Sequence, residues 1–103
     1  MTEIDDKFFD RADEHINLSN QQVKNVSMGK VSASMMYSVA RFNAWVSAFG
    51  WNNGKEMAEA KEETLDYFVE QYKKMLKENL EEYINNFDSY MKNDYFNDGS
   101  PNA

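Results

Sequence analysis

The sequence contains no cysteine, one proline and four glycines among its 103 residues. Without cysteine the chain has no disulfide, no thiolate metal ligand and no thiol nucleophile, which suits a reducing compartment. It also lacks a run of about 18 apolar residues, so we expect no membrane-spanning helix. The acidic start, residues 1–6, lacks the basic and then apolar pattern of a secretory signal. We therefore expect a cytoplasmic protein.

Basic residues are scarce, with 11 lysines and arginines against 18 aspartates and glutamates and a net charge of −7. Lysine and arginine drive binding to nucleic-acid phosphates and to anionic lipid. The charge therefore argues against nucleic-acid and membrane partners, and a partner protein would be basic. No cofactor motif is present, so we expect no cofactor.

Apolar residues make up 42% of the chain, which is enough for one hydrophobic core. We expect a single helical domain over residues 1–96, because a chain of this length has no room for a second core. Residues 97–103 contain glycine and proline among polar residues and are predicted to form a flexible tail.

Hydrophobic spacing of three and four residues predicts helices over 4–26, 31–49 and 55–92. Thr2 is the expected cap of the first helix, with Asp5 and Asp6 in its first turn. A turn at 27–30 is expected to use Gly29, and Asn53 with Glu56 has the spacing of a capping box. The middle helix is apolar nearly all round, which predicts an all-α, three-helix antiparallel bundle with a long C-terminal helix.

The third predicted helix is much longer than the other two, about 55 Å against about 30 Å. Its distal apolar side chains would lie beyond the cover of their own chain, and such surfaces are rarely left in water. Either the helix breaks near residues 85–86 and folds back, or a second copy covers it. We predict a homodimer whose interface contains Leu80, Tyr83, Ile84, Phe87, Tyr90 and Met91.

Residues for catalysis or metal binding are hard to assemble, and we predict no catalytic residue and no metal site. His15 is the only histidine. It falls within the apolar arc of the first helix, where a core histidine is a more economical interpretation than a base. A di-iron helix bundle needs two histidines, and no phosphate-binding or calcium loop is present.

A ligand site is suggested by Arg41 and Asn43, two polar residues on an otherwise small and apolar helix. If Arg41 is buried, it needs a carboxylate, such as that of Asp10, Asp13, Glu14 or Asp66. The alternative is an anion-binding pocket, for which the candidate residues are Arg41, Asn43, Tyr37, His15 and Trp51. Trp51 is interpreted as a lid over the helix ends, and Tyr67 as a candidate for a second interface.

Several segments resemble a family of short acidic proteobacterial proteins known only as a domain of unknown function. The residues that carry the resemblance are Phe8–Phe9, 16–18, 29–34, Tyr37, 40–44 and 66–76. It implies a bacterial cytoplasmic protein and assigns no activity. We therefore predict a non-enzymatic homodimeric protein-interaction module, with a small-ligand or anion-binding protein as the alternative.

Overall fold

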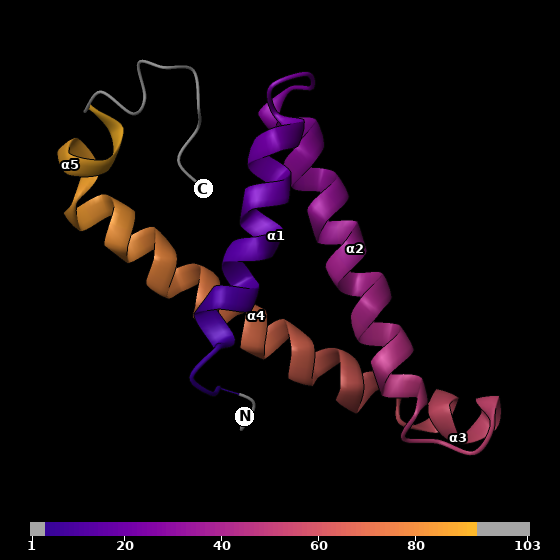
Figure 1. The fold of residues 1–103 in the computed structure, drawn as a ribbon. Coiled ribbons are helices and arrows are strands. Elements are labelled where there is room, and N and C mark those ends of the chain that lie inside the picture. Colours follow the sequence, from indigo (N-terminus) through magenta and orange to yellow (C-terminus); the bar gives the residue numbers. More distant parts are fainter. Residues whose placement is uncertain (1–3, 93–103) are drawn as a thin grey trace. The chain divides into compact units, whose positions relative to one another are not determined.

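The structure is a computed structural model that describes residues 4–92. These residues are 81% helical and contain no strand. The helices are α1 (Phe8–Gln22), α2 (Met28–Ala48), α3 (Gly54–Glu59), α4 (Lys61–Asn85) and α5 (Phe87–Met91), shown in Figure 1. The all-α class is therefore confirmed. Thr2 and the predicted tail at 97–103 lie outside the described residues.

The chain divides into two compact units. The first contains α1 and α2 as far as Tyr37, and the second begins at Ser38 and contains the rest of α2, α3, α4 and most of α5. None of the helices in the described residues is long and apolar enough to cross a membrane.

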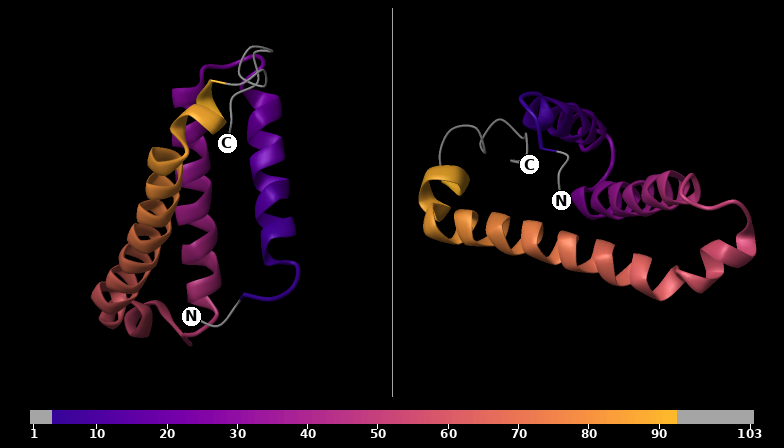
Figure 2. Two further views of the ribbon diagram at one scale, coloured as in Figure 1. Left: turned by 90° about the vertical axis from the view of Figure 1, so that its left-hand side faces the viewer. Right: turned by 90° about the horizontal axis from the view of Figure 1, so that it is seen from below.

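In the first unit, α1 and the start of α2 run in opposite directions from their connection (Figures 1 and 2). The apolar arc predicted for the first helix is confirmed in part. Phe8, Ala12, Ile16 and Val23 are half-buried at helical spacing, whereas Ile4, Phe9 and Val26 are exposed. Ser19 Oγ lies 3.7 Å from Met35 Sδ on α2. Val31, 6% exposed, is the most buried side chain of this unit in the described residues.

The predicted turn at 27–30 is wrong by a few residues. Gly29 lies inside α2, and the connection runs over residues 23–27. Ser27 ends the connection, because its Oγ accepts a hydrogen bond from the backbone nitrogen of Lys30 at 3.3 Å. A serine that satisfies a free amide of the first helical turn outweighs the tendency of glycine to end a helix.

The start of α1 also differs from the prediction. The helix begins at Phe8, so Asp5 and Asp6 precede it instead of occupying its first turn. Asp5 pairs with Arg11, one turn into the helix, with 2.6 Å between Asp5 Oδ1 and Arg11 Nη2. This hydrogen bond and the adjacent positive charge lower the pKa of Asp5.

In the second unit, the long helix predicted over 55–92 is divided at Ala60 and at Asn86. Both residues leave helical geometry, with φ −94° and ψ 4° at Ala60 and φ −125° and ψ 31° at Asn86. The carbonyl of Glu82 accepts two hydrogen bonds from Asn86, one from the side-chain Nδ2 and one from the backbone nitrogen, each at 3.0 Å. A side chain that competes for a helical carbonyl favours a helix end. Figure 2 shows α5 turning away from the axis of α4.

The predicted cap at Asn53 is confirmed at the start of α3. Asn53 Oδ1 accepts from the backbone nitrogen of Glu56 at 2.9 Å, which satisfies an amide that the helix leaves free. The reciprocal bond of the predicted capping box is shifted by one residue, because Glu56 Oε1 accepts from the backbone nitrogen of Asn52, at 2.9 Å, instead of that of Asn53.

Replacing Asn53 with alanine is expected to lower the free energy of unfolding by about 1 kcal/mol, because the cap hydrogen bond is lost. Urea unfolding followed by circular dichroism measures the change. Asn52→Ala is the matched control, since Asn52 contributes its backbone nitrogen and not its side chain. Equal destabilisation by both changes would contradict the assignment of the cap to Asn53.

Candidate functional site

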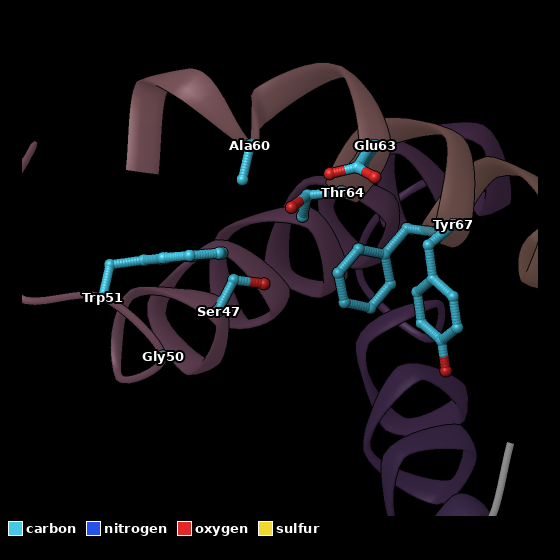
Figure 3. A pocket seen from close by; sticks show the side chains of 8 residues that line it. Ser47, Gly50, Trp51, Ala60, Glu63, Thr64 and Tyr67 are labelled. Carbon is cyan, nitrogen blue, oxygen red and sulfur yellow. The ribbon is translucent and has the colours of Figure 1, made fainter. Parts of the chain in front are cut away.

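The second unit carries a surface hollow of about 450 Å³ where the end of α2 meets the start of α4. Figure 3 shows the side chains that line it, which come from three parts of the unit. We call this site the Trp51 hollow, and its lining residues are Ser47, Gly50, Trp51, Ala60, Glu63, Thr64, Tyr67 and Phe68.

The backbone around Gly50 directs the chain from α2 into the hollow. Gly50 N donates to the carbonyl of Ser47 at 3.0 Å, and Trp51 N donates to that of Ala48 at 3.2 Å. A Cβ at position 50 would lie 3.3 Å from the carbonyl oxygen of Ser47, which is a tight contact. The turn that presents Trp51 is therefore best served by a residue without a side chain.

The opposite wall begins at the bend between α3 and α4. Ala60, 8% exposed, is one of the two buried apolar residues in the described part of the chain. From this bend, α4 contributes residues at helical spacing, with Thr64 and Phe68 half-buried on the same face. Glu63 and Tyr67, one position earlier in each turn, are exposed at the rim.

The hollow has two exposed aromatic side chains and one carboxylate. Trp51 and Tyr67 are 40% and 46% exposed, and Figure 3 shows them on opposite sides, with Glu63 and Thr64 between them. The ring of Tyr67 packs edge-to-face against that of Phe68, with 5.1 Å between centroids. The hydroxyl of Ser47 donates to the carbonyl of Asn43 at 2.8 Å. The hollow therefore offers exposed aromatic area and one negative charge.

A second surface of this unit is the apolar stripe of α4, defined as its large side chains at spacings of three and four. Most of them are exposed, by between 42% and 70% of their area: Leu65, Val69, Tyr72, Leu76, Leu80 and Ile84. Phe87, just after the bend, is 52% exposed. The elements of this unit therefore leave the stripe largely uncovered.

The bend at Asn86 brings Tyr90 back onto α4. The ring of Tyr90 packs against that of Tyr83 with 4.7 Å between centroids, and its hydroxyl donates to the carboxylate of Glu82. The hydrogen bond to Glu82 raises the pKa of Tyr90, because losing the phenolic proton would break it. Two of the six predicted interface residues, Tyr83 and Tyr90, thus contact each other within one chain.

Comparison with known protein families gives a match over residues 8–84, to proteins described as of unknown function, DUF3144. The chain belongs to the DUF3144 family. This confirms the resemblance stated from the sequence. Among solved structures, the NMR structure of the protein NB7890A from Shewanella sp. is 42% identical in sequence to this chain, with a TM-score of 0.72. The alignment covers 86% of this chain and 95% of that one. No curated protein matches.

The five predicted ligand-binding residues of this DUF3144 protein are distributed over both units. His15 and Tyr37 belong to the first unit, and Arg41, Asn43 and Trp51 to the second. His15 is exposed on α1, so the interpretation of a core histidine is wrong. The half-buried face of α1 is narrower than the apolar arc predicted from the sequence, and His15 lies just outside this face.

Arg41 is exposed on α2, and no carboxylate of its own unit, Asp66 included, lies within 4.0 Å of it. Exposure removes the need for the expected ion pair, since water solvates the guanidinium. Of the five residues, Trp51 lines the hollow. The anion-binding site around Arg41 stays a prediction.

The Trp51 hollow itself was missed by sequence reasoning, although Trp51 and Tyr67 were each singled out. The two residues are 16 positions apart, and no spacing rule links a loop residue to a helix across a bend at an alanine. Glu63 could not be recognised as a site residue from the sequence, because it lies in a run of acidic residues that is typical of the solvated start of a helix. In the described residues, no group of three or more acidic or histidine side chains is placed to hold a metal ion.

Proposed function

We propose that this DUF3144 protein is a non-enzymatic helical interaction module that works as a homodimer. The observation that carries the proposal is the exposed apolar stripe of α4. Leu80, Ile84 and Phe87, all predicted interface residues, are 53%, 70% and 52% exposed. Burying one such side chain fully is worth about 1.5 to 3 kcal/mol, so the stripe is a strong driving force for association.

Helix length supports a second copy as the cover. The 25 residues of α4 extend over about 37 Å, whereas the 15 residues of α1 extend over about 22 Å. No other helix of the described residues is as long as α4, so none can cover its stripe from end to end. A second copy supplies another α4 of equal length, so the distal parts of two stripes, from Leu80 onward, can cover each other about a two-fold axis.

The second apolar face of the unit lies on α2 and strengthens the case for association. Phe42, Trp45 and Phe49 form a row of rings in contact, tilted in the first pair and edge-to-face in the second, with 5.4 Å and 5.0 Å between neighbouring centroids. All three are more than half exposed, at 60%, 57% and 73%. Aromatic residues are enriched at protein–protein interfaces, where they supply much of the binding energy.

Light scattering coupled to size exclusion tests the proposal at tens of micromolar chain. A homodimer gives twice the chain mass of 12.1 kDa. Repeating the measurement at high salt is expected to leave the dimer intact, because burial of apolar area is not screened by ions. The mass of one chain at every concentration would contradict the proposal.

A further inference from the structure

The rim of the Trp51 hollow combines exposed aromatic side chains with a negative charge. Trp51 and Tyr67 keep 40% and 46% of their area exposed, and Phe68 adds a third ring, which packs edge-to-face against that of Tyr67 with 5.1 Å between centroids. The negative face of an aromatic ring attracts ammonium and guanidinium groups within about 6 Å of its centroid, tryptophan most strongly. The exposed ring of Trp51 therefore favours a cation at this rim.

The negative charge around the hollow also favours a cationic occupant. Glu63 lies at the rim between Trp51 and Tyr67 and is exposed (Figure 3). From Gly54 to Tyr67 the sequence has five acidic residues, Glu56, Glu59, Glu62, Glu63 and Asp66, against two lysines, Lys55 and Lys61. An anion would be repelled here, and a neutral apolar group would desolvate Glu63 without compensation. A cationic group gains from both the carboxylate and the rings.

The shape of the hollow indicates a side chain presented by a larger molecule. The hollow is widely open to solvent, so a small free ion would make few contacts there. The apolar stem of an arginine or lysine can lie against the rings while its charged end reaches Glu63. The hydroxyls of Ser47 and Thr64 complete the lining.

We propose that the Trp51 hollow binds an arginine or lysine side chain from a basic segment of a partner protein. This inference rests on the proposed role as an interaction module and names the partner's chemistry and the place where it docks. It does not depend on the dimer, because every lining residue belongs to the second unit of one chain.

The experiment is a titration of the ¹⁵N-labelled full chain with an acetylated peptide of alternating glycine and arginine, followed by NMR. We expect saturable shifts of the Trp51 indole signal and of the backbone amides of residues 63–68. A peptide of the same length with glutamate in place of arginine is expected to leave these signals unmoved.

Matched variants distinguish binding at the hollow from general attraction between the basic peptide and the acidic chain. Glu63→Gln is expected to weaken peptide binding about three- to fivefold, and Trp51→Leu by a similar factor. Glu70→Gln removes an equal charge from an exposed position of α4 outside the hollow and is expected to leave the affinity unchanged. The free-state spectrum of each variant shows whether the fold is kept, and the conservative Glu63→Gln change carries the test if Trp51→Leu does not fold.

Three results would overturn the proposal: no saturable shift at millimolar peptide, shifts confined to other surfaces, or equal weakening by Glu63→Gln and Glu70→Gln. Light scattering on the same samples keeps this test separate from that of the dimer. A monomer that binds the peptide contradicts the dimer alone, and a dimer that does not bind it contradicts the hollow alone.

Discussion

Replacing both Leu80 and Ile84 with glutamate is expected to raise the dissociation constant of the homodimer at least a hundredfold. The two side chains are 53% and 70% exposed in one chain, so the subunit itself tolerates the change. In the dimer each loses about 1.5 kcal/mol or more of apolar burial, and about 1.4 kcal/mol corresponds to tenfold in affinity. Two buried carboxylates facing their symmetry mates add to the loss. Sedimentation velocity over a concentration series measures the dissociation constant.

The matched control places the same residue change elsewhere on the same stripe. Leu65 is 52% exposed, nearly the same as Leu80, but lies at the other end of α4. Because the predicted interface residues begin at Leu80, Leu65→Glu is expected to have the smaller effect on the dissociation constant. A double variant at 80 and 84 that dimerises as tightly as the original chain would refute the assignment of this face to the interface.

The second large effect is expected from Val31→Ala in the first unit. Val31 is 6% exposed on α2, next to the connection from α1, and its backbone nitrogen donates to the carbonyl of Ser27 at 3.1 Å. Removing two methyl groups from a buried site costs their transfer free energy and leaves a cavity, together about 2 kcal/mol. For a domain of this size the melting temperature is expected to fall by about 10 °C.

Val69→Ala is the control for this change, because Val69 is 56% exposed on α4 and its truncation leaves no enclosed cavity. Thermal unfolding followed by circular dichroism compares the two at one chain concentration, since a dimer makes the melting temperature depend on concentration. If Val69→Ala destabilises the chain as much as Val31→Ala, Val31 is not the centre of the core of its unit.

Helices were predictable from the sequence because their signals are local. The spacing of Phe8, Ala12 and Ile16 marks one face of α1, and the pair Asn53 and Glu56 marks the start of α3. The bends were harder to predict. Alanine is the strongest helix former, and nothing in its neighbours singles out Ala60, whereas the pair at 85–86 was recognised as a candidate break. The break at Asn86 has a local cause, the hydrogen bond from its side chain to the carbonyl of Glu82.

The candidate site was less predictable because it joins residues that are distant in sequence. Trp51 and Tyr67 were each recognised as unusual, but only the path of the chain through Gly50 and Ala60 places them around one hollow. For Arg41, the sequence suggested burial, but the structure shows an exposed side chain. Its apolar neighbours along the helix suggested burial, yet neighbours in sequence lie on all sides of a helix and do not by themselves bury a side chain.

The most direct test of the account is an isotope-filtered NOE experiment on an equal mixture of ¹³C-labelled and unlabelled chains. If a second copy covers the apolar stripe of α4, the methyl groups of Leu80 and Ile84 show NOEs to protons of the unlabelled chain. We expect these intermolecular contacts in the homodimer. NOEs from the same methyl groups only to their own chain, in a particle with the mass of one chain, would contradict it.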